Sequence, residues 1–109
     1  MEASSPREFF EKVLPQRFKA DKAVGVDVTV QVNITGSNSG SWAAKVKDQK
    51  LEVTEGVCSS PTLTLQMADR DFVDLVNGKL SPEKAFFTGK VQFKGNIALA
   101  IKLRETGFL

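Results

Sequence analysis

The chain has 109 residues, of which 41% are apolar and 26% charged; this size and composition fit one globular domain and exclude the disordered and fibrous classes. Fifteen basic residues nearly balance thirteen acidic ones, so the overall charge gives no indication of nucleic-acid binding. The lack of histidine removes the commonest general base and metal ligand, and a single cysteine cannot form a disulfide within the chain. We therefore expect one domain over residues 1–109, without catalytic activity, metal or cofactor.

A short amphipathic helix is predicted near the N-terminus. Ser5 has the form of an N-cap, Pro6 fits the first helical position, and Glu8 completes a capping box. Apolar residues follow at helical spacing until Pro15, which is expected to interfere with the helix. No apolar run reaches the ~20 residues that span a bilayer, and the first ten residues lack the apolar core of a signal peptide. A cytoplasmic location is expected.

Alternation of apolar and polar residues predicts a sheet with one solvated face. From Val26 to Ile34 every second residue is valine or isoleucine, and a turn rich in glycine and serine follows at 36–41. The next strand begins near Trp42 and forms a hairpin with the first. Residues 51–54 and 61–67 predict a third and a fourth strand. The expected order is an antiparallel meander followed by one further strand.

The period then changes from two to that of a helix. Asp69 is a favourable N-cap for a helix that ends at Asn77, and Ser81 opens a second helix of about two turns. Residues 90–94 predict a short strand, and a final helix is expected from Ile97 to about Arg104. The final helix is apolar on every side between residues 97 and 101, which predicts burial all round.

Three chemical sites can be considered in this half of the chain. The carboxylates Asp69, Asp71 and Asp74 suggest a metal or acid–base site, but helix capping and the helix dipole explain their positions. The Gly89-Lys90 pair lacks the first glycine and the hydroxyl residue of a phosphate-binding loop. Six basic residues and one acidic residue lie between 79 and 104. Solvated lysines are the simpler account of this bias, and an anionic head group or membrane surface is the alternative.

Small residues leave two interpretations of the core open. Alanines at 98 and 100 and valines in the first strand permit either very close packing or a dry apolar void that holds an apolar ligand. The residue types by themselves slightly favour close packing over a void.

Four stretches closely resemble the signature of the sterol carrier protein type 2 family. They are Asp69 to Phe72, Val76 to Pro82, Ala85 to Val91, and Lys94 to Leu103 apart from Ile97 and Ile101. The predicted first helix and the Trp42 hairpin also fall where that family has them, and the compact length is similar to its stand-alone prokaryotic members. The resemblance implies an α+β fold, in which about four to five helices cover one face of a five-stranded mixed, mostly antiparallel sheet and enclose an apolar tunnel.

The resemblance also implies a function. It indicates binding and transfer of a fatty acid, fatty acyl-CoA, phospholipid or sterol, with no catalysed reaction. The protein is expected to be a monomer or a weak homodimer. The residues that it predicts to line the tunnel are Val28, Val30, Trp42, Ala44, Phe72, Leu75, Val76, Phe86, Phe87, Val91, Phe93, Ile97, Ala100 and Ile101. Lys90 and Lys94 are predicted to contact an anionic head group or membrane. A non-catalytic accessory or dimerisation module with a filled core remains the rival interpretation.

Overall fold

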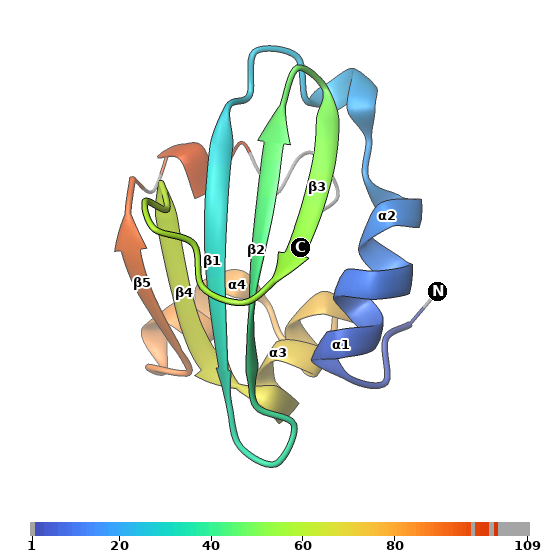
Figure 1. The fold of residues 1–109 in the computed structure, drawn as a ribbon. Helices are drawn as coiled ribbons and strands as arrows, with labels where there is room; N and C mark the ends of the chain where they lie inside the picture. Colours follow the sequence, from blue (N-terminus) through green and yellow to red (C-terminus); the bar gives the residue numbers. More distant parts are fainter. Residues whose placement is uncertain (1, 97, 101, 103–109) are drawn as a thin grey trace.

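A five-stranded mixed sheet forms the centre of the computed structural model, which describes residues 2–96, 98–100 and 102 (Figure 1). The spatial order of the strands is β3-β2-β1-β4-β5. The strands are β1 (Val28–Thr35), β2 (Gly40–Lys47), β3 (Lys50–Glu55), β4 (Leu63–Ala68) and β5 (Val91–Gly95). Neighbouring strands are antiparallel except for β1 and β4, which are parallel. The predicted α+β class with a mixed, mostly antiparallel sheet is confirmed.

The register of the sheet explains its two faces. Val30 pairs with Ala44, and Val32 pairs with Trp42, so the apolar residues of adjacent strands share one face. The opposite face carries polar side chains, among which Gln31 is nevertheless 3% exposed. Gln31 is buried because the connection from β3 to β4 crosses in front of β2 and β1 (Figure 1). The Gln31 side-chain oxygen accepts a hydrogen bond from the N–H of Cys58 in this connection, at 2.7 Å.

The first helix runs from Pro6 to Arg17 in three parts: α1 (Pro6–Glu8), the π-helical η1 (Phe9–Val13) and α2 (Leu14–Arg17). Ser5 caps it as predicted, since its hydroxyl accepts the Glu8 N–H at 3.1 Å. The Glu8 carboxylate accepts from Ser4 instead of closing a capping box on Ser5. The expectation that Pro15 interrupts the helix is wrong, because the chain stays helical beyond the proline. The irregularity lies before it, where the helix widens to a π turn.

Three shorter helices are η2 (Ala20–Lys22), α3 (Asp69–Val76) and α4 (Pro82–Phe87). Ser81 caps α4 as predicted and accepts the Lys84 N–H at 3.0 Å. The prediction that Asp69 caps α3 is wrong, since the N-cap is Ala68. The Asp69 carboxylate accepts hydrogen bonds from the N–H groups of Asn38 and Arg70, and therefore ties the β1–β2 turn to the start of α3.

The predicted final helix is described only in part. Residues 98–100 and 102 are helical, whereas 97, 101, 103 and 104 lie outside the described residues. Leu99 and Ala100 are half-buried against the core, but Ala98 is exposed. The expectation of burial on every side is therefore wrong at Ala98, because this helix presents only part of its surface to the core.

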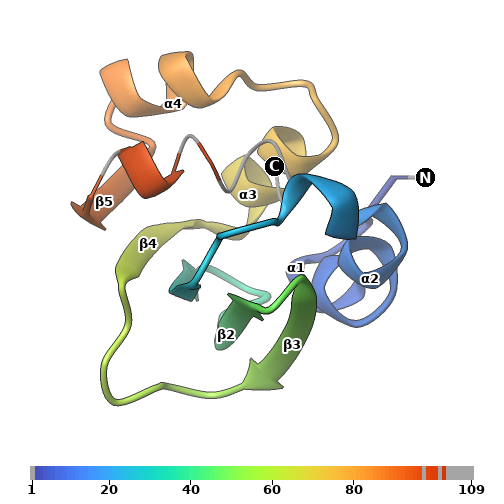
Figure 2. The same ribbon diagram turned by 90° about the horizontal axis from the view of Figure 1, so that it is seen from above.

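The core lies between the apolar face of the sheet and the helices, which gather on that face (Figure 2). Its centre is a group of aromatic rings from the first helix, α3 and β2. Phe9 meets Phe72 edge-on at 5.5 Å, and Phe10 stacks on both Phe72 and Trp42. Within the described residues, no helix has the length and apolarity to cross a bilayer.

Candidate functional site

A groove of about 750 Å³ lies where the first helix meets the edge strand β3. Its volume falls within the range of about 300–1,000 Å³ that is usual for small-molecule sites. Helical and connecting segments contribute one wall, and the sheet with the β2–β3 turn contributes the other. The lining residues are Phe10, Glu11, Pro15, Phe18, Ala20, Trp42, Gln49, Lys50, Leu51, Val53 and Glu55.

The apolar surface of the groove arises because β3 is the edge of the sheet. Leu51 and Val53 pair with Val46 and Ala44 and face inward with them. Their partners on β2 are fully buried, yet Leu51 and Val53 are only half-buried. Phe18, just beyond the first helix, is half-buried in the same way. The fold thus leaves aliphatic and aromatic side chains incompletely covered along this edge.

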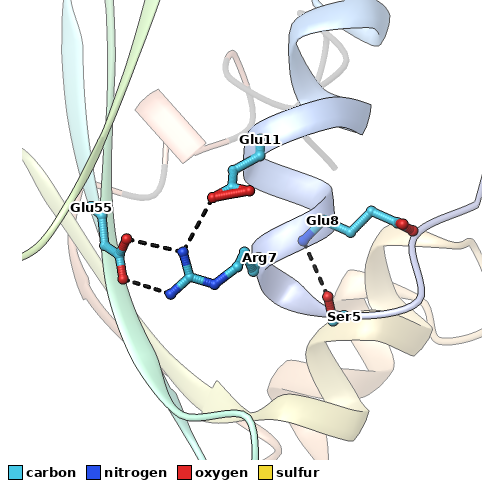
Figure 3. Close-up of polar contacts among 5 residues, drawn as sticks. All are labelled: Ser5, Arg7, Glu8, Glu11 and Glu55. Carbon is cyan, nitrogen blue, oxygen red and sulfur yellow. Dashed lines mark hydrogen bonds and ion pairs between the residues drawn. The ribbon is translucent and has the colours of Figure 1, made fainter.

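Polar contacts hold the two ends of the groove. At the start of β3, the Gln49 side-chain N–H donates to the Ala20 carbonyl at 3.1 Å. At the end of β3, the Arg7 guanidinium makes two hydrogen bonds to the Glu55 carboxylate, at 2.7 and 3.0 Å (Figure 3). Arg7 also donates to Glu11 at 3.1 Å. These contacts link the helical wall to the strand wall.

The charges at the Arg7 end are matched and partly solvated. Hydrogen bonds from Arg7 lower the pKa of the Glu55 carboxyl, and bonds to Glu55 and then Glu11 raise the pKa of Arg7. All three side chains are more than half exposed, so water screens their attraction. With Lys50 in the lining, two cations face two carboxylates, and the rim of the groove carries no net charge.

Trp42 is the polar feature of the groove that stands out. Its side chain is 3% exposed, stacks on Phe10 at 5.2 Å and lies beneath the Arg7 guanidinium. Within the described part of the chain, the buried indole Nε1 has no hydrogen-bond partner. A buried donor without an acceptor costs about 1–3 kcal/mol.

The structure distributes the predicted lining residues over three environments. Of the described members, Trp42 borders the groove. The buried members, which pack within the core, are Val28, Val30, Ala44, Phe72, Leu75 and Val76. Val91, Phe93 and Ala100 are half-buried against the core, while Ile97 and Ile101 lie outside the described residues.

Phe86 and Phe87 do not face the interior. They are 53% and 85% exposed, so the expectation that they point into an enclosed tunnel is wrong. The physical reason is the short helix α4, which turns the fully buried Ala85 toward the core and the two rings toward solvent. Lys90 and Lys94 are both exposed, but Lys94 lies on the polar side of β5 opposite Thr64. Their contact with head groups stays a prediction.

The residues that sequence reasoning missed are those of the groove wall. Phe10 and Phe18 belong to the N-terminal region, and Leu51 and Val53 belong to β3. The alternation of β3 was visible in the sequence, but its position at the edge was not. Two inward-facing aliphatic residues on an edge strand are the signal that locates the groove, and it requires the strand order.

Comparison with known proteins gives a consistent result. Residues 10–106 match the model of the SCP-2 sterol transfer family. Human sterol carrier protein 2 is 39% identical over 70 residues, which are 64% of this chain and 13% of that protein. The chain therefore spans a small part of the length of this curated relative.

Two solved structures share both the fold and part of the sequence. The sterol carrier protein domain 2 of Helicoverpa armigera is similar at a TM-score of 0.73 and 32% identity, over 92% of this chain and 80% of that one. The palmitated SCP2L2 of Aedes aegypti is similar at a TM-score of 0.64 and 28% identity, over 89% and 93% of the two chains.

Proposed function

Because the chain belongs to the SCP-2 sterol transfer family, we propose that it binds a lipid in the groove between the first helix and β3 and transfers it, without catalysing a reaction. The observation that carries this proposal is the groove itself, which half-buried apolar side chains line beside the buried ring of Trp42. Family membership supports the class of ligand, and the groove supplies a place for it.

The proposed ligands are a fatty acid, a fatty acyl-CoA, a phospholipid or a sterol. The solved Aedes aegypti relative is described as palmitated, which supports a fatty acyl chain for this domain. Burial of one methylene is worth about 0.8 kcal/mol, so ten of them supply about 8 kcal/mol before the costs of association. The resulting affinity is at best near the micromolar range, which suits a carrier because it must also release its ligand.

Orientation follows from the distribution of polar groups. We place the apolar part of the lipid against Phe18, Leu51 and Val53, and its polar end at the Arg7–Glu55 end of the groove. The matched charges of Arg7 and Glu55 favour a neutral acceptor there, such as an ester carbonyl or a hydroxyl. A free carboxylate would have to compete with Glu55 for the Arg7 guanidinium.

The rival function, an accessory or dimerisation module with a filled core, is favoured by one observation. Phe72 and the buried valines of β1 pack against the rings of the first helix, so these predicted lining residues contact one another. A tunnel through them would require the core to open. Their contact with lipid stays a prediction, and the groove carries the proposed site without it.

Two neighbouring residues of β3 provide a matched test. Val53 faces the groove, and Thr54 faces the polar side of the same strand. We expect Val53→Arg to weaken lipid binding at least tenfold and Thr54→Arg to leave it unchanged, because only the first places a charge against the acyl chain. Trp42 is the only tryptophan, so quenching of its fluorescence by the methyl ester of brominated stearic acid measures occupancy of this groove.

The outcomes separate the candidates. Equal affinity of the Val53→Arg variant and the wild type would show that the lipid binds elsewhere. No binding by the wild type, together with native mass spectra free of any co-purified lipid, would refute the carrier function and favour the filled module.

A further inference from the structure

Helix α4 presents two large aromatic side chains to solvent. Phe87 is 85% exposed and Phe86 is 53% exposed, and their rings meet edge-on with centroids 6.1 Å apart. The helix that carries them is anchored, because Ala85 is fully buried and Ser81 caps the first turn. The two rings are therefore held outward by a fixed backbone.

Exposed aromatic pairs on an anchored element are typical of interaction surfaces. A phenylalanine ring has no polar group that water can satisfy, so the exposed pair gains free energy from any apolar environment that covers it. Ala85 is the residue of this group that packs in the core, whereas most of the surface of the Phe86 and Phe87 rings stays outside it. Within the described part of the chain, the two rings are left available to an apolar partner.

The charge around α4 identifies the kind of partner. Residues 79–90 contain three lysines and one acidic residue, Glu83. The Lys79 ammonium is 3.9 Å from the Glu2 carboxylate and remains exposed. Lys84 lies one turn before Phe87 on the helix, and the Lys90 N–H donates to the Ala85 carbonyl at 2.9 Å, which brings Lys90 back to the helix end. The Lys90 ammonium is 3.9 Å from the Asp71 carboxylate and remains 45% exposed. Lysines around an exposed aromatic pair complement an anionic lipid surface.

We propose that α4 is a membrane-docking element, in which Phe86 and Phe87 enter the interface of an anionic bilayer while Lys84 and Lys90 contact its head groups. This surface lies beside β5, at the opposite edge of the sheet from the groove beside β3 (Figure 2). Docking through α4 therefore leaves the groove uncovered. The proposal rests on the geometry of α4 and can hold or fail independently of lipid binding in the groove.

A fluorophore at Phe87 tests insertion directly. Cys58 is the only cysteine, so Cys58→Ser provides a background for labelling at a chosen position. We would introduce Phe87→Cys or, as a matched control, Val57→Cys, since Val57 is 80% exposed but lies on the β3–β4 connection. With a nitrobenzoxadiazole label, the emission at position 87 should shift to the blue on vesicles of phosphatidylcholine and phosphatidylglycerol, and the emission at position 57 should not.

Unlabelled variants supply the affinity. Phe87→Ser should reduce co-sedimentation with the mixed vesicles about tenfold or more, the loss expected when a buried aromatic contact is removed. Val57→Ser should have no such effect, because Val57 lies on the β3–β4 connection and not on α4 or its ends. Salt should weaken binding, since the Debye length falls from about 30 Å at 0.01 M to about 8 Å at physiological ionic strength.

Three results would overturn the proposal. One is an equal blue shift at positions 57 and 87, and another is co-sedimentation of the Phe87→Ser variant at the wild-type level. The third is a concentration-dependent dimer in sedimentation velocity that Phe87→Ser abolishes, with no vesicle binding by either protein, because this would make α4 a contact between copies of the chain. Quenching of Trp42 by the methyl ester of brominated stearic acid in the Phe87→Ser variant reports separately on the groove.

Discussion

Gly40, the first residue of β2, controls the position of Trp42 in the groove. A Cβ built on Gly40 would lie 2.8 Å from Cη2 and 3.1 Å from Cζ3 of the indole. Carbon atoms pack at about 3.5–4.0 Å, so in Gly40→Ala the ring must move by about 0.7–1.2 Å or the strand must shift. The ring has little room to move, because it is 3% exposed and stacks on Phe10.

The expected magnitude combines two opposing effects. Overpacking of a filled site costs about 1–3 kcal/mol. Gly40 does not adopt a positive φ, so alanine also restricts the unfolded chain and returns about 0.4–1 kcal/mol. We therefore expect Gly40→Ala to lower the free energy of unfolding by up to about 2.6 kcal/mol and to weaken lipid binding, because the displaced indole narrows the groove.

Urea denaturation followed by Trp42 fluorescence measures the change in stability, and the emission maximum of the folded protein reports displacement of the ring. Quenching of Trp42 by the methyl ester of brominated stearic acid measures lipid binding. Ser39→Ala is the matched control, because Ser39 is an exposed residue of the adjacent turn. An unfolding free energy and an emission maximum equal to those of the wild type would refute the reasoning, for they would show that the ring accommodates the methyl group without displacement.

Two further predictions concern polar contacts outside the groove. Gln31→Leu should lower the free energy of unfolding by about 1–3 kcal/mol, because it removes the acceptor of the Cys58 N–H and the donor to the Gly56 carbonyl. The Cys58 amide should then exchange with deuterium faster, and an unchanged exchange rate would contradict this role. Hydrogen bonds from the N–H groups of Asn38 and then Arg70 lower the pKa of Asp69. Its contribution to stability is therefore complete above the unfolded pKa of about 3.9 and is lost as pH falls through the lower folded value. Asp69→Asn should reduce the acid dependence of the urea midpoint, and identical pH profiles of variant and wild type would disprove the linkage.

Local patterns in the sequence predicted most of the fold correctly. The alternation from Val26 to Ile34 and from Trp42 to Val46 placed the inward residues of β1 and β2, which the structure buries. The caps at Ser5 and Ser81 were also correct. These features depend on the conformation of a few consecutive residues, so periodicity and capping chemistry are sufficient to find them.

The failures share a different physical origin. The Asp69 cap was wrong because the Asp69 carboxylate accepts the N–H of Asn38, a residue 31 positions earlier in the chain. Burial of Ala98 and of the Phe86 and Phe87 side chains was also expected wrongly. Composition reports how apolar a short helix is, but it does not report which of its sides meets the sheet.

The sequence by itself therefore determined the strands, the helices and, by resemblance, the family. Tertiary structure alone decided that β3 is an edge strand, that Leu51 and Val53 are left half-covered beside Trp42, and that α4 turns its aromatic side chains outward. The physical reason is that strand order and helix orientation follow from contacts between segments distant in the chain, such as the parallel pairing of β1 with β4. The groove lies at the β3 edge of the sheet, and α4 lies beside the β5 edge. Both edges follow from this pairing.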